Sequence, residues 1–95
     1  MKPNDILIAE NVYSNMVYFL QVVRATRATV TVREIHACKR TGLPMVGHFK
    51  DYHDPITKRV NDGRIRLGNW TSAELWDGTP VHNEHPMWGL NYNLY

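Results

Sequence analysis

Two β-prone runs separated by a short polar segment constrain the fold more than any other feature of the chain. The first run, residues 17–23, is apolar except for Gln21, and the second run is residues 29–35. Their β-branched and aromatic side chains fit a pleated surface, so the two runs predict an antiparallel hairpin. In the second run Val30 and Val32 share one parity, which indicates one buried face. The first run is apolar on both parities, so we expect a central strand covered on both sides.

Short β-prone segments bounded by turn residues fill much of the remaining chain. We predict a first strand at residues 6–9 and a short strand at 45–49. A second hairpin should join arms 56–60 and 64–67, because Asp-Gly in the turn Asn61-Asp62-Gly63 supplies the positive φ that a tight turn requires. The arms of this hairpin should point four apolar side chains inward: Ile56, Val60, Ile65 and Leu67.

Residues 69–76 predict a short strand or a single helical turn, and no sustained helical periodicity or internal repeat is present. The 95 residues suffice for one domain, spanning 1–95. We therefore expect an all-β fold: a small antiparallel barrel or rolled sheet of about five to seven strands, of the SH3-like small-barrel type.

Composition and cysteine usage limit the classes of protein to consider. No segment reaches the roughly 18 apolar residues of a membrane span, and the start of the chain does not resemble a signal peptide. The single Cys38 cannot form an internal disulfide, which agrees with a reducing compartment. We expect no membrane association, a location in the cytoplasm of a bacterial host, and a packing role for Cys38.

The charges are unevenly distributed along the chain. Residues 24–66 hold ten of the eleven Lys and Arg residues, and no basic residue follows Leu67, where Glu74, Asp77 and Glu84 occur among aromatics. This distribution indicates a basic side and a weakly acidic, aromatic side. The basic residues that we expect to contact a macromolecule are arginines of the two hairpins: Arg24, Arg27, Arg33, Arg59, Arg64 and Arg66.

The arginine surface is open to three interpretations. Together with nearby aromatic residues it could bind nucleic acid, as other small barrels do. Arginine is also enriched at protein interfaces, so the same surface could contact a protein. An arginine-rich sheet face can equally be a solvated surface without a partner.

The C-terminal residues alternate as a strand would. Large apolar side chains occupy one parity, and the other parity carries Gly and Asn. We expect residues 87–95 to form an interaction strand that makes a homodimer or docks on a target, because such a terminus must bury its apolar face. Trp70 and Trp76 are instead expected to close the core. The predicted interface residues are Trp88, Leu90, Tyr92, Leu94 and Tyr95.

Candidate catalytic and metal-binding residues are weakly supported. His82 and His85 flank Glu84, but no helix aligns them as metal ligands. Cys38 near His36 lacks the context of an activated nucleophile. We expect no metal, no cofactor and no enzymatic activity, and a small metal-dependent or thiol enzyme is the third-ranked alternative.

Four segments taken together resemble a family of small uncharacterised β-rich proteins carried by bacteriophages and other mobile elements. The segments are residues 13–23, 29–35, 55–60 and 75–80. The resemblance implies an accessory protein that binds host machinery. We therefore expect a non-enzymatic protein that binds a host macromolecule, with a host protein as its partner and inhibition of a defence system such as a CRISPR nuclease as its effect. A nucleic-acid-binding small barrel is the second-ranked alternative.

Overall fold

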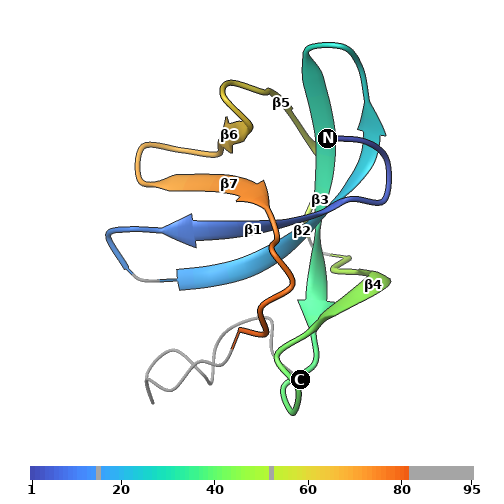
Figure 1. The fold of residues 1–95 in the computed structure, drawn as a ribbon, viewed down its shortest axis with the longest axis vertical. Helices are drawn as coiled ribbons and strands as arrows, with labels where there is room; N and C mark the ends of the chain where they lie inside the picture. Colours follow the sequence, from blue (N-terminus) through green and yellow to red (C-terminus); the bar gives the residue numbers. More distant parts are fainter. Residues whose placement is uncertain (15, 52, 82–95) are drawn as a thin grey trace.

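The computed structural model describes residues 1–14, 16–51 and 53–81, and it shows one seven-stranded antiparallel sheet (Figure 1). The sheet order is β4-β3-β2-β1-β7-β6, and β5 pairs with β3. Among the described residues, no helix has the length and apolar character needed to span a membrane. The strands are β1 (Ile6–Asn11), β2 (Met16–Ala25), β3 (Thr29–Ala37), β4 (Pro44–Phe49), β5 (Ile56–Arg59), β6 (Arg64–Arg66) and β7 (Thr71–Leu75).

The predicted all-β rolled sheet is confirmed, but the roll does not close into a barrel. The beginning of β3 pairs with β5 and its end with β4, so two strands share one edge of the longest hairpin. Over residues 56–66, all of which are described, β5 and β6 are joined by a single bridge between Asn61 and Arg64. The sheet therefore curls until β5 and β6 are neighbours without forming a full ladder.

The predicted first hairpin is confirmed as β2 and β3. Phe19 pairs with Ile35 and Val22 with Val32, and the register shifts between Val22 and Arg24. Such a bulge increases local twist and bends the strand, which helps the sheet to roll. Strand β2 lies between β1 and β3, as its apolar character on both parities predicts.

Apolar residues are buried on both faces of the sheet. We call the face of the larger cluster the inner face; the outer face carries Phe19, Ile35 and Ala37, packed against Trp76 and Val81. Alternate residues of β2 supply both clusters, which explains why this strand lacks a polar parity. The inner cluster consists of Leu7, Ala9, Leu20, Val22, Val30, Val32, Ile65 and Ala73.

Residues 76–81, here called the strap, cover the outer cluster after β7 (Figure 1). The Trp76 ring meets Phe19 edge-on with ring centroids 5.6 Å apart, and Trp76 Nε1 donates to the Thr79 carbonyl at 2.8 Å. The Val81 amide donates to the Gly42 carbonyl at 2.8 Å. Gly42 has a φ of +73°, and a Cβ there would lie 2.5 Å from the Val81 carbonyl oxygen, so the contact requires glycine.

The second hairpin forms its predicted turn but not its predicted pairing. Asp62 and Gly63 have φ of 53° and 76°, as in the two-residue turns that Asp-Gly favours. The strands on either side of this turn separate, because β5 bonds to β3 whereas β6 bonds to β7. Ile65 is buried as expected, whereas Ile56 stands opposite Val32 on the inner side and lines a small cavity there, so it is only partly covered and stays 41% exposed.

Residues 71–75 form strand β7, which resolves the choice between a strand and a helical turn. Ala73 pairs with both Ala9 and Ile65 and is buried with them. Of the two tryptophans expected to close the core, Trp76 does so. The prediction for Trp70 is wrong, because this residue precedes β7 in a turn and its side chain points to solvent.

Candidate functional site

Three large side chains are exposed together where the β1–β2 and β6–β7 turns meet. Val12, Tyr13 and Trp70 are 64%, 80% and 58% exposed. The Tyr13 and Trp70 rings lie with centroids 5.8 Å apart at an angle of 39°. We call these three residues the aromatic knob. Tyr and Trp offer large rigid contact areas and are enriched at binding hot spots.

Hydrogen bonds from neighbouring residues hold the aromatic knob in place. The Asn11 side-chain oxygen accepts from the amides of Tyr13 and Ser14, both at 3.0 Å, and its nitrogen donates to Thr71 Oγ1 at 2.9 Å. The Val12 amide donates to the Trp70 carbonyl at 2.9 Å. The two turns are therefore fixed to each other, and ordering the aromatic knob on binding requires little further loss of entropy.

A groove of about 660 Å³ begins beside the aromatic knob and crosses β1, β7 and β6. The register places Glu10 opposite Ser72, and Glu74 between Ile8 and Arg64. Apolar side chains of β1 and β2 adjoin these polar ones. The residues lining the groove are Ile8, Glu10, Val12, Val17, Arg64, Ser72, Glu74, Leu75, Asp77, Thr79, Pro80 and Val81.

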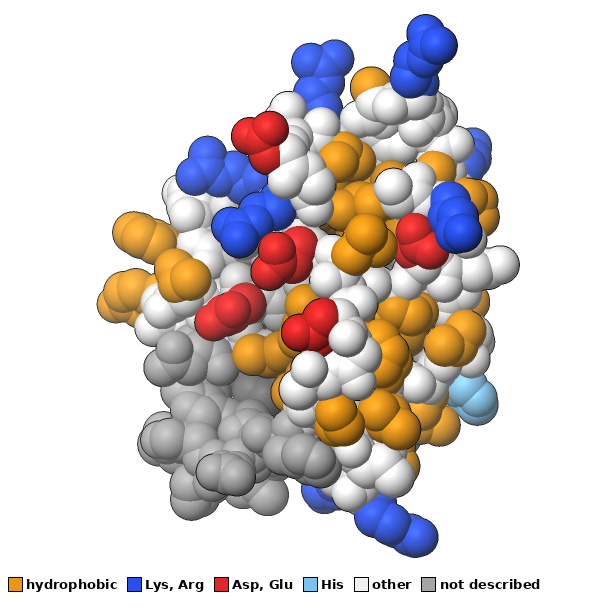
Figure 2. All heavy atoms as spheres, viewed as in Figure 1, with side chains coloured by type: hydrophobic (Ala, Val, Ile, Leu, Met, Phe, Trp, Pro, Cys, Tyr) orange, Lys and Arg blue, Asp and Glu red, His pale blue; other side chains and the backbone are white. Residues whose placement is uncertain are grey.

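The described lining of the groove is acidic overall. Glu10, Glu74 and Asp77 contribute carboxylates, and Arg64 is the one basic residue among the lining side chains named above. Arg64 Nε lies 3.4 Å from Glu74 Oε2. Hydrogen bonding from Thr79 lowers the pKa of Asp77, which keeps that carboxylate charged. On the face seen in Figure 2, acidic side chains lie among apolar ones near the centre, whereas Lys and Arg lie mainly towards the periphery.

The six arginines predicted to contact a macromolecule lie along β2, β3, β5, β6 and the β2–β3 turn. Five are exposed: Arg24, Arg27, Arg59, Arg64 and Arg66. Arg33 is half-buried, with its guanidinium carbon 4.4 Å from the centre of the Phe49 ring. Arg24 of β2 stands opposite Thr31 and Arg59 of β5 opposite Thr29, so these two arginines flank β3 from either side. Arg64 differs from them in being paired with Glu74.

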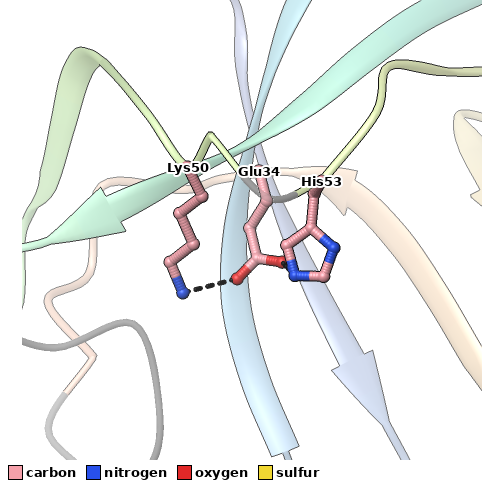
Figure 3. Close-up of polar contacts among 3 residues, drawn as sticks. All are labelled: Glu34, Lys50 and His53. Carbon is pink, nitrogen blue, oxygen red and sulfur yellow. Dashed lines mark hydrogen bonds and ion pairs between the residues drawn. The ribbon is translucent and has the colours of Figure 1, made fainter.

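A second polar cluster consists of Glu34, Lys50 and His53 (Figure 3) and adjoins a small cavity of the sheet. Glu34 lies between Lys50, whose Nζ is 2.7 Å from Glu34 Oε2, and His53, whose Nε2 is 3.4 Å from Glu34 Oε1. The Lys50 amide also donates to the Glu34 carbonyl at 3.0 Å. The Lys50 side chain is almost wholly buried, so this ion pair ties the segment after β4 to β3.

A small cavity of about 180 Å³ adjoins this cluster and includes Tyr18, Leu20 and Ile56 in its lining. Burial, and secondarily the nearby Glu34 carboxylate, raise the pKa of Tyr18. Burial, with a contribution from Lys50, lowers the pKa of His36. Both shifts favour the neutral form of the side chain. We interpret the cluster of Glu34, Lys50 and His53 as a structural link between β3 and the segment after β4 rather than as a reaction centre, since its carboxylate is engaged by Lys50 and His53.

Several predicted residues lie outside the part of the chain that the structure describes. They are the C-terminal interface residues within 87–95 and the candidate metal ligands His82 and His85. Within residues 1–14, 16–51 and 53–81, no group of three or more His, Cys, Asp or Glu side chains could hold a metal ion.

Sequence reasoning missed the aromatic knob. Trp70 is predicted from the sequence to close the core, although Gly68-Asn69 before it indicates a turn. Tyr13 follows Asn11 by two residues, and Asn at that spacing commonly bonds the backbone of a turn. These two turn sequences could have identified exposed aromatic residues, but not that the turns meet.

No protein-family model, curated protein or solved structure matches the chain. The resemblance to proteins of mobile elements therefore stays a prediction. Function has to be inferred from the surfaces that the fold presents.

Proposed function

We propose that this protein is a non-enzymatic binding protein that docks a partner protein on the aromatic knob and the acidic groove beside it. The observation that carries the proposal is the exposure of Tyr13 and Trp70 in ring contact outside the core. Exposed apolar side chains that occur singly need no explanation, but a fixed aromatic pair continuous with a groove has the composition of an interface centre.

Charge complementarity defines the partner chemistry. The partner should present an apolar or aromatic side chain to the aromatic knob and a Lys or Arg to the carboxylates of Glu10, Glu74 and Asp77. Opposite charge at the rim increases the association rate and selects against acidic competitors. The exposed ion pair between Arg64 and Glu74 does not oppose this arrangement, because exposed ion pairs contribute little stability.

A second part of the proposal concerns the biological setting of the protein. A host protein is the proposed partner, and blocking a host defence nuclease such as a CRISPR effector is the proposed effect. These two points are supported by the resemblance to proteins of mobile elements and by the small size of the chain. They are separable from the docking surface and are tested separately.

The experiment compares immobilised wild-type protein with one double variant and one single variant in nuclease-treated host lysate. Tyr13→Ala with Trp70→Ala removes the aromatic knob, and Val46→Ala removes an exposed apolar side chain on β4 as a matched control. We expect one host protein to be retained by the wild type and by Val46→Ala but not by the double variant. Equal retention by all three, or by none, contradicts the docking surface.

The defence-related part needs an activity measurement. Purified host nuclease is assayed with its guide and target in the presence of each variant. Inhibition by the wild type and by Val46→Ala, and its loss in the double variant, is the expected result. Capture of a host protein without any inhibition would retain the docking surface and reject the defence role.

A further inference from the structure

The outer face of β2, β3 and β5 carries threonine and arginine side chains in register. Arg24 of β2 stands opposite Thr31 of β3, which in turn stands opposite Thr57 of β5. Thr29 of β3 stands opposite Arg59 of β5. Residues directly opposite each other in antiparallel strands point to the same side of the sheet, roughly 5 Å apart. We call these five residues the Thr–Arg face.

Two hydroxyls of this face, those of Thr31 and Thr57, are hydrogen-bonded to each other, and the Thr29 hydroxyl bonds that of Thr26 in the β2–β3 turn. Thr31 Oγ1 lies 2.8 Å from Thr57 Oγ1, and either can donate to the other. Whichever of the two hydroxyls donates, the hydrogen of the other hydroxyl remains to be donated elsewhere. Thr57 is exposed, and Thr31 opposite it on β3 is buried, so an external acceptor would meet the Thr57 hydroxyl first. The face thus offers neutral donors between its two arginines.

Arg33 extends this face towards β4. It lies two residues from Thr31 on the same parity and holds its guanidinium over the Phe49 ring at 4.4 Å. Within the described part of the chain, its buried Nε has no hydrogen-bond partner. The stacking fixes the side chain against the sheet, which reduces the entropy lost when its terminal nitrogens bind an anion.

No Asp or Glu occurs on the outer parity of β2, β3 or β5, whose residues are all described. Glu34 of β3 belongs to the inner parity, where Lys50 and His53 engage it. The outer parity also lacks an exposed aromatic ring, since Phe19 is buried under the strap. The Thr–Arg face therefore combines guanidinium donors of positive charge with neutral hydroxyls, and it has no exposed aromatic ring of β2, β3 or β5 on which a base could stack.

We propose that the Thr–Arg face, together with Arg33, binds the phosphate backbone of duplex nucleic acid. Phosphate oxygens only accept hydrogen bonds and carry negative charge, which matches a surface of cationic guanidinium donors and hydroxyls that can donate. Binding to single strands without base stacking is weak, whereas a duplex presents regularly spaced phosphates to a rigid surface. This site is separate from the acidic groove, so it adds a second binding activity to the proposed docking of a protein.

The test measures binding of a labelled short DNA duplex by fluorescence anisotropy over a series of salt concentrations. Arg24→Gln with Arg59→Gln removes two charges from the Thr–Arg face. Lys39→Gln with Arg40→Gln removes two exposed charges from the β3–β4 loop and serves as the control with equal net charge. Thr57→Val removes the outer hydroxyl without changing the charge. A single-stranded oligonucleotide of the same sequence is titrated in parallel.

We expect the parent to bind the duplex at low salt and to bind the single strand more weakly. Each phosphate contact contributes about 0.9 to the slope of log affinity against log salt, so Arg24→Gln with Arg59→Gln should reduce that slope by about two. The loop control should leave the slope nearly unchanged, and Thr57→Val should weaken binding severalfold without altering the slope. The proposal is overturned if the duplex is not bound, if both double variants reduce the slope equally, or if the single strand binds more tightly.

Discussion

Tyr13 and Trp70 lie in different turns, yet their rings are in contact outside the core, with centroids 5.8 Å apart. Their turns are joined by the hydrogen bond from the Val12 amide to the Trp70 carbonyl. Aromatic pairs of this kind usually stabilise a core, and here the pair is largely solvent-exposed. The contact is therefore better suited to recognition than to stability, and this leads to the first prediction.

Trp70→Ala and Trp76→Ala should have different effects on folding. Trp76 packs on Phe19 and bonds the Thr79 carbonyl, so its loss should cost about 3 kcal/mol, whereas loss of the exposed Trp70 should cost less than about 1 kcal/mol. Urea titration of each variant measures both values. A larger cost for Trp70 would make the aromatic knob a structural element.

Glu34→Gln should destabilise the protein by about 3 kcal/mol, because it leaves the buried Lys50 cation without its carboxylate at 2.7 Å. Glu34→Leu combined with Lys50→Met should recover much of that loss. Glu74→Gln, which breaks the exposed pair with Arg64, is the matched control and should cost under about 1 kcal/mol. Thermal unfolding of the four proteins distinguishes them, and equal effects of Glu34→Gln and Glu74→Gln would show that burial of the first pair is unimportant.

Gly42→Ala should be far more damaging than Gly63→Ala, although both glycines have positive φ. At Gly63 an added Cβ meets open space, so only backbone strain of about 1 kcal/mol is expected. At Gly42 the added Cβ would collide with the Val81 backbone, which raises the cost to about 3 kcal/mol or detaches the strap.

Tryptophan fluorescence reports the state of the strap in these glycine variants. A red shift of Trp76 emission in Gly42→Ala, absent from Gly63→Ala, is the expected sign that the strap has left the outer cluster. Identical stability and emission in the two variants would mean that the Gly42–Val81 contact is dispensable.

Stability should fall as the pH rises above about 10, and Tyr18 should contribute to this fall. An unfolded tyrosine ionises near pH 10, whereas burial and then Glu34 raise the pKa of Tyr18 in the folded protein. Above about pH 10 the unfolded state therefore releases the Tyr18 proton, whereas the folded state still holds it. Rising pH then lowers the free energy of unfolding. Urea midpoints at about pH 9 and about pH 11 should differ less in Tyr18→Phe than in the parent. An equal difference between the two midpoints in Tyr18→Phe and in the parent would contradict a contribution from Tyr18.

The sequence predicted the strands and turns of this fold better than it predicted which strands pair with each other. The β2–β3 hairpin follows from local side-chain preference, and the two-sided burial of β2 follows from its lack of a polar parity. The turn at Asp62-Gly63 was also predictable, because it depends on two residues alone. The separation of β5 from β6 depends on competition between distant strands, which no local pattern contains.

The candidate site was less predictable for the same reason. The arginines could be named from the sequence, but their register with Thr29 and Thr31 depends on the bulge after Val22 and on the pairing of β3 with β5. The aromatic knob requires two turns far apart in the chain to meet. Residues 87–95, the interface predicted from alternation, lie outside the described residues, and their role stays a prediction.

The most direct measurement of the central claim is the dissociation constant between the purified protein and the host protein that it retains. Isothermal titration should show that Tyr13→Ala with Trp70→Ala weakens binding by about 30-fold or more, as expected for loss of a hot spot. Val46→Ala, which alters an exposed apolar residue elsewhere, should bind as the wild type does. An unchanged dissociation constant in the folded double variant would contradict docking on the aromatic knob.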